Sequence, residues 1–215
     1  MAYSYYSRLS SRQQAIYRAS DRVGEIPLPR PAALRPCVQA LRASLADDDR
    51  RAVASAAATL SQTLLEQLGA PAVALTVLAV RPSRKWGELH GLYTADEEKP
   101  AEIRLWMRTA RHKRVVAFRT FLRTLLHELC HHLDYHTLKL ADSFHTEGFF
   151  RRESNLFRQL VPSVLPAEAA APDPPTSARA RRAVRPKQAP ARDKKAARTG
   201  DERQGRLRFD SGERQ

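Results

Sequence analysis

Five consecutive residues, His127-Glu-Leu-Cys-His131, contain the side chains of this chain that are best suited to chemistry. On a helix, two residues four positions apart lie one turn apart on the same face, so both imidazoles can reach a single metal ion. Glu128 then lies at the flank of the site, where it can hold a metal-bound water without being a ligand. This HExxH arrangement is typical of zinc peptidases, in which zinc lowers the pKa of its water to about 7 and a carboxylate accepts the proton.

A third ligand is needed, because a catalytic zinc usually has three protein ligands and one open position. Two candidates for this third ligand follow the motif, namely His145 and Glu147. If Glu147 were the ligand, the site would have two histidines and one glutamate. Gly148 is expected to supply an unusual backbone angle beside them. The alternative to a metal site is an exposed helix with a histidine cluster, because His132 and His136 also lie close by.

The segment that begins with the HExxH motif and ends at Phe149 resembles the zinc site of SprT-like metallopeptidases, the Spartan group. Members of that family have the motif on a helix, then a loop of similar length, then a third histidine followed by glycine and soon by phenylalanine. The resemblance implies that His127, His131 and His145 bind one zinc ion. It also implies that Glu128 is the catalytic general base.

The same resemblance, which covers residues 73–161, implies a minimal zincin-like domain with residues 102–108 as an edge strand. Such a strand near the metal would hold an extended peptide substrate by β-addition. Spartan-type proteases act on DNA-bound proteins, which implies a protein substrate of that class. The sequence differs from the family in two respects: Thr146 directly follows His145, and no cysteine-rich zinc ribbon follows the site.

Several residues near the motif have competing interpretations. Asp134 would either orient a ligand histidine or be a solvated helix residue. Arg151 and Arg152 would either stabilise an oxyanion or form a solvated basic turn, and the turn is the favoured interpretation. Cys130 is expected to be a buried structural thiol. His132 and His136 are expected to point away from the metal face, either as surface groups or as groups that contact the ligands from outside.

The motif lies near the end of the strongest predicted helix, residues 115–138, whose apolar residues recur at helical spacing. Three strands are expected before it. Residues 73–80 form an apolar β-branched run, residues 88–94 are a second candidate, and residues 101–109 alternate between apolar and polar positions. The last two strands are expected to form a hairpin.

The remaining elements are predicted to be helices and connecting segments. Residues 7–23 are expected to be helical, and residues 26–36 contain four prolines and are expected to be a linker or extended loop. An alanine-rich helix is expected to begin at the acidic cap of residues 47–49 and to end at Gly69. A last helix is expected over residues 156–161.

The pattern predicts an α+β fold, in which a small mixed or antiparallel sheet packs on the HExxH helix of a minimal zincin-like domain. We expect an N-terminal helical region over residues 1–70 and the metallopeptidase domain over residues 71–165. Residues 166–215 are rich in proline, alanine, arginine and lysine and are predicted to be a disordered basic tail.

The 215 residues carry a formal net charge of +14. A positive field attracts polyanions, so the alternative function is that of a basic nucleic-acid-binding protein with a structural or inactive zinc site. Two cysteines cannot form a disulfide framework, which favours a reducing, cytoplasmic location. Residues 1–20 are basic and contain no acid, which leaves a mitochondrial transit peptide as the alternative. The longest apolar run, residues 70–80, is about half the length of a membrane span, so no membrane partner is expected.

Overall fold

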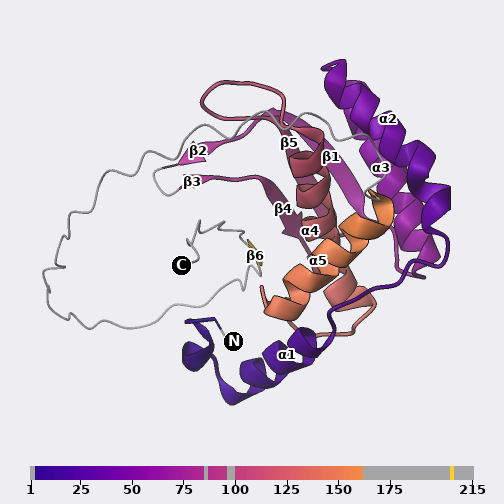
Figure 1. Ribbon diagram of the computed structural model, residues 1–215. Coiled ribbons are helices and arrows are strands. Elements are labelled where there is room, and N and C mark those ends of the chain that lie inside the picture. The colour runs from indigo at the N-terminus through magenta and orange to yellow at the C-terminus, as the bar shows by residue number, and fades with distance from the viewer. Residues whose placement is uncertain (1–2, 85–86, 96–99, 162–203, 206–215) are drawn as a thin grey trace, which may run out of the picture.

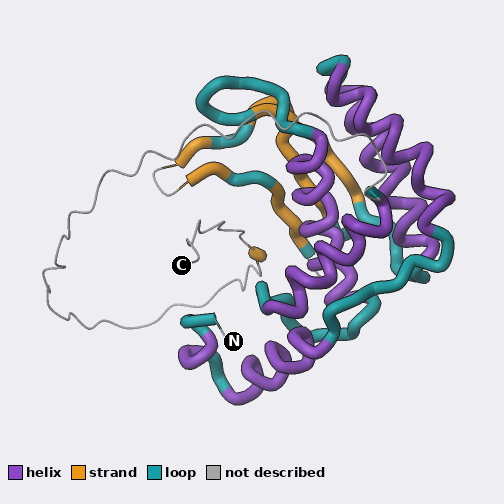
Figure 2. The backbone as a smooth tube through the Cα atoms, in the orientation of Figure 1, coloured by secondary structure: helices purple, strands orange, loops and turns teal. Residues whose placement is uncertain are grey.

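The computed structural model describes residues 3–84, 87–95, 100–161 and 204–205, which form an α+β fold (Figure 2). The helices of the described residues are α1 (Ser11–Arg22), α2 (Arg35–Ala46), α3 (Arg50–Gln67), α4 (Phe118–His136) and α5 (Glu147–Leu160). The strands are β1 (Ala74–Val80), β2 (Ser83–Arg84), β3 (Gly87–Glu88), β4 (Gly91–Thr94), β5 (Glu102–Arg108) and β6 (Gln204–Gly205). The predicted disordered tail lies outside the described residues, apart from β6.

The main sheet is mixed, with the strand order β1-β5-β4 and with β6 beside β4. Strand β5 pairs in parallel with β1 and antiparallel with β4, so the predicted β4–β5 hairpin is confirmed. The prediction that residues 102–108 form an edge strand is wrong, because β5 lies between two neighbours. Strand β4 lies nearer the edge instead, and Tyr93 and Thr94 pair there with β6.

Strand β5 has the predicted two-residue alternation because one of its faces lies against the helices. Ile103, Leu105 and Met107 are buried, whereas Arg104 is exposed. Trp106 on the opposite face is also buried, so it is a packing residue. The sheet therefore presents an apolar face that can support the HExxH helix.

Helix α4 packs against β4 and β5, and α5 packs across it (Figure 1). Its C-terminal half is buried on nearly all sides, from Leu125 to Asp134. The helix begins at Phe118 and not at residue 115, because Val115 forms an antiparallel bridge to Arg108 and so extends the sheet. The HExxH motif thus lies between a sheet and a second helix, where its polar side chains are shielded from water.

Helix α3 begins and ends at ordinary capping signals. Asp49 accepts hydrogen bonds from the first backbone amides of α3, and Gly69, with a φ of 63°, follows its end, as predicted. The prediction of a linker or extended loop over residues 26–36 is wrong for residues 31–36, which are helical. A 3-10 helix (Pro31–Leu34) leads directly into α2, and Pro36 lies in the first turn of α2, where the missing N–H costs nothing.

One hydrophobic core joins α2 and α3 to the sheet, α4 and α5, and it includes Leu41, Leu60, Leu105, Leu129 and Leu156. The predicted boundary near residue 70 falls at the turn between α3 and β1. Helix α1 lies at the other end of the molecule, against α5. No helix among the described residues is long and apolar enough to cross a membrane.

Candidate metal centre

Three of the predicted site residues come together: His127 and His131 from α4, and His145 from the loop before α5. The Nε2 atoms of His127 and His145 are 3.0 Å apart, and those of His145 and His131 are 3.1 Å apart. Tetrahedral zinc with Zn–N bonds of 2.0–2.1 Å separates its nitrogens by about 3.3 Å. The three imidazoles, whose ligand atoms all lie within 4.8 Å of one another, could therefore hold one metal ion.

The positions of the protons on the imidazole rings favour the binding of one cation between the three Nε2 atoms. Nδ1 of His127 faces a carboxylate oxygen, and Nδ1 of His131 faces a hydroxyl that itself donates to a carboxylate. Both Nδ1 atoms therefore carry the proton, and both Nε2 atoms present lone pairs. One N–H on His145 can be donated to only one of these lone pairs, whereas a cation would bind all three nitrogens.

Glu153 on α5 orients His127. Its Oε2 lies 3.2 Å from Nδ1 of His127, and its Oε1 accepts a hydrogen bond of 3.2 Å from Arg123. A carboxylate at this position fixes the tautomer of a metal-binding histidine and makes its other nitrogen a stronger ligand. No local pattern indicates this role, because Glu153 lies 26 positions from its partner.

Ser143 joins His131 to a buried ion pair. Its Oγ lies 2.7 Å from Nδ1 of His131 and donates a hydrogen bond of 2.7 Å to Asp134. Asp134 also accepts a hydrogen bond of 2.7 Å from Arg152, and the side chains of both members of this ion pair are completely buried. Asp134 therefore acts on His131 through Ser143, and its interpretation as a solvated helix residue is wrong.

The two neighbouring arginines differ in their surroundings. Arg152 is completely buried and donates hydrogen bonds to Asp134 and to the backbone of Ser20 and Val23, so a solvated turn is wrong for it. Arg151 is exposed and donates to a backbone carbonyl of α1. Arg152 is thus a link between α4, α5 and the end of α1.

Glu128 is completely buried, and neither carboxylate oxygen has a hydrogen-bond partner among the described residues. Burial raises its pKa well above the ordinary value, and the charge of Glu153 adds to this. The backbone N–H of Tyr93 is near enough to favour the ionised form, but it makes no hydrogen bond of normal geometry. A buried carboxyl group without a partner needs an explanation, and a bound water or ion would supply one.

Two of the three histidines, His131 and His145, are held in the neutral form that can bind a metal. Burial lowers the pKa of His131 well below its ordinary value, and the nearby His127 and His145 lower it further. Burial and the neighbouring His127 lower the pKa of His145 to about 3. Both imidazoles are therefore neutral at pH 7, and no proton has to leave before a metal binds.

The ring of Phe149 packs against all three imidazoles on one side of the site. Its ring centroid lies 4.8 Å from those of His127 and His131 and 5.2 Å from that of His145. The ring is completely buried. An apolar surface behind the nitrogens keeps water from that side and limits the rotation of the rings.

The residues that follow His145 have structural roles at the start of α5. Thr146 is the N-cap of α5, and its side chain accepts a hydrogen bond from the backbone N–H of Phe149. Gly148 has no positive φ, so the expected unusual backbone angle is wrong. A Cβ there would stand 2.4 Å from the carbonyl oxygen of Asp21, so glycine is needed for the close approach of α1. Glu147 is exposed and does not belong to the histidine group.

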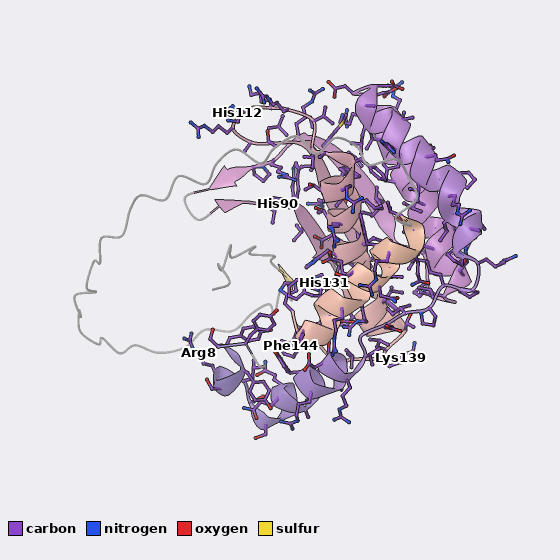
Figure 3. All side chains as sticks on the ribbon, viewed as in Figure 1. Arg8, His90, His112, His131, Lys139 and Phe144 are labelled. Atoms are coloured by element: carbon purple, nitrogen blue, oxygen red, sulfur yellow. The ribbon has the colours of Figure 1, made fainter. Side chains whose placement is uncertain are left out.

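The remaining histidines lie elsewhere. His132 is buried on the sheet side of α4, where its Nδ1 lies 3.2 Å from the hydroxyl of Tyr93 and its Nε2 lies 2.9 Å from the carbonyl of Pro71. Figure 3 shows His112 away from His131, whereas His90 lines a depression with Thr124 and Glu153. Cys130 is buried in the core, in agreement with a structural thiol.

The donor set of three imidazoles suits zinc, and also copper, nickel or iron. The residues present therefore fit a transition-metal site, with Glu128 as a neighbouring carboxyl group. Comparison with protein-family models, with curated proteins and with solved structures finds no match to this chain. The chemistry of these side chains is therefore the basis on which a function is inferred.

Proposed function

We propose that this protein is a zinc-dependent metallopeptidase with a minimal zincin-like domain of the SprT-like type. The observation that carries the proposal is the convergence of three imidazoles, two from α4 and one from the loop before α5, whose ligand atoms lie within 4.8 Å of one another. Beside them α4 carries a buried carboxyl group that has no hydrogen-bond partner among the described residues. Structural zinc sites are usually closed by four protein ligands. A set of three leaves a position for water or substrate.

His127, His131 and His145 hold the metal, and Glu153 and Ser143 fix the first two rings by accepting from Nδ1. When bound, zinc lowers the pKa of a coordinated water and polarises a carbonyl group. A cation at this position favours the ionised form of Glu128, which burial alone opposes. Glu128 then accepts the proton of the attacking water and delivers it to the leaving amine.

In this proposal an extended polypeptide substrate binds beside strand β4. Its outer edge already accepts extended backbone, because β6 pairs antiparallel with Tyr93 and Thr94. Gly91 at the start of β4 lies directly against Glu128, so a peptide along this strand would pass close to the proposed base. A depression between His90, on the approach to β4, and Thr124 and Glu153, on the helices, could receive a substrate side chain. These features support an extended polypeptide as substrate.

The test is substitution of Glu128 by glutamine, with Glu66→Gln as a matched control on the exposed face of α3. Glu128→Gln should keep one zinc ion per chain and lower peptidase turnover by about 10²-fold or more, because the base is lost. Glu66→Gln should leave both unchanged. Full turnover in Glu128→Gln would contradict the mechanism.

The second candidate is nucleic-acid binding, and one observation favours it. Residues 111–114, Arg-His-Lys-Arg, are all exposed on the loop between β5 and α4, where Figure 3 shows His112 away from His131. Together with the net charge of +14 this supports contact with phosphates. DNA binding that weakens with salt and survives Glu128→Gln, with no hydrolysis of any substrate by the wild type, would favour this function over the first.

A further inference from the structure

The loop that carries His145 is attached to the N-terminal segment, residues 3–23. The hydroxyl of Tyr5 donates a hydrogen bond of 2.9 Å to the backbone carbonyl of His145 itself. The two residues are 140 positions apart, and Tyr5 stands at the start of the 3-10 helix (Tyr6–Arg8) that precedes α1. The N-terminus therefore contacts the third metal ligand directly at its main chain.

The end of α1 holds the residues that follow His145. The hydroxyls of Ser20 and Thr146 are 3.3 Å apart, and Asp21 accepts a hydrogen bond of 2.8 Å from the backbone N–H of Gly148. The backbone of Asp21 comes so close to Gly148 that any side chain there would collide with it. Helix α1 thus fixes both the cap and the first turn of α5.

His145 depends on these contacts more than the other two ligands do. His127 and His131 lie on α4, whose position is fixed by the hydrophobic core. His145 lies in an irregular stretch between α4 and α5, and its Nε2 faces only the other two imidazoles. A ligand held by a loop needs its main chain anchored, because a small displacement of the ring removes it from the metal.

We propose that residues 3–23 are a part of the metal centre, and that Tyr5 is a positioning residue for His145. The inference rests on the proposed metal function. It predicts that a hydroxyl far from the motif in sequence controls metal affinity. Tyr5→Phe keeps the ring contacts with Tyr3 and Tyr17 and removes only the hydrogen bond to His145.

Tyr6→Phe is the matched control, because Tyr6 packs on the same Tyr17 ring but its hydroxyl accepts from Arg18 and does not reach the loop. Zinc dissociation constants would be measured for the full chain by competition with a chromophoric chelator. Tyr5→Phe should weaken zinc binding roughly tenfold, whereas Tyr6→Phe should match the wild type. The unfolding midpoints of the metal-free Tyr5→Phe and Tyr6→Phe proteins should be similar, which separates positioning from stability.

The same substitution in the His145→Ala background completes the test. There, Tyr5→Phe should cause no further loss of zinc affinity, because the ligand that it positions is gone. An unchanged affinity of Tyr5→Phe in the wild-type background, or an equal loss in both backgrounds, would overturn the inference while leaving the metal centre intact. A wild-type protein that binds no zinc would overturn the metal function itself, and the inference with it.

Discussion

The carboxyl group of Glu128 lies so close to Gly91 that a Cβ on this glycine would stand 2.2 Å from Oε1. Strand β4 can therefore pass beside the proposed base only because this position has no side chain. The φ of Gly91 is not positive, so the requirement is space and not backbone conformation. The relationship connects the edge of the sheet to the chemistry of α4.

Gly91→Ala should therefore impair the site. The new methyl group would collide with Glu128 and with the methyl of Thr124, which would lie 2.8 Å away. We expect a loss of about 1–3 kcal/mol of unfolding free energy and a lower kcat/KM, because β4 or the base must shift. Gly24→Ala is the control, since the nearest atom there belongs to the flexible side chain of Arg151. Equal stability and activity for both variants would refute the close-approach argument.

Ser143→Ala should weaken metal binding. The substitution removes the acceptor that fixes the Nδ1 proton of His131 and separates that ring from Asp134. Zinc affinity should fall by about 10–100-fold, with the fold retained. Isothermal titration with zinc would measure it, beside Ser44→Ala, whose hydroxyl only bonds within α2. Unchanged affinity in Ser143→Ala would show that the link to Asp134 has no effect on the ligand.

Arg152→Met and Arg151→Met should differ strongly in stability. Arg152 is completely buried and pairs with Asp134, so its removal leaves a buried carboxyl group without its cation. We expect a loss of about 3–5 kcal/mol in urea unfolding. The exposed Arg151 should change the unfolding free energy by no more than about 0.5 kcal/mol. Similar losses in both variants would contradict the assignment of the buried ion pair.

The metal-free protein should lose stability in acid partly through His145. Its folded pKa of about 3 lies below the ordinary value of 6.5, so between these values the unfolded chain binds the proton and the folded one does not. The protonation of His145 therefore does not reduce the free energy of unfolding above pH 6.5. Below pH 6.5 it reduces this free energy by at most about 1.4 kcal/mol for each pH unit.

His145→Gln removes this titration and should give a shallower decline between pH 6.5 and 4. The raised pKa of Asp134, about 6, acts in the opposite direction, but it is present in both proteins, so the difference between them reports His145 together with its effect on His131. Urea unfolding in the presence of a chelator would measure both curves. Parallel curves would show that the pKa of His145 is not lowered.

Much of the fold follows from local sequence signals. The alternation in β5, the acidic cap of α3 and the apolar face of α4 each determine an element by themselves, and each is found where the pattern predicts it. The start of helix α2 was not predicted, because prolines 27, 29, 31 and 36 are typical of a loop. Pro36 lies in the first turn of α2, which is the part of a helix that tolerates proline. Helix α5 begins earlier than its apolar residues suggest, because Thr146 caps it.

The residues of the site could be predicted only where they lie close to one another in the sequence. The pair in the HExxH motif follows from the helical repeat, and His145 was expected from the family resemblance. Glu153, Ser143 and Tyr5 reach the ligands through tertiary contacts that span between 12 and 140 positions. No periodicity in a single sequence reports such contacts. The position of β5 inside the sheet was missed for the same reason, since strand order depends on non-local pairing.

The most direct test of the account is the metal content of the purified full chain, measured beside His145→Ala and Glu147→Ala. The account predicts one zinc ion per chain in the wild type and in Glu147→Ala, because Glu147 is exposed and outside the histidine group. His145→Ala should retain much less zinc. A wild type without bound metal, or zinc that is lost with Glu147 and kept without His145, would contradict the proposed three-histidine centre.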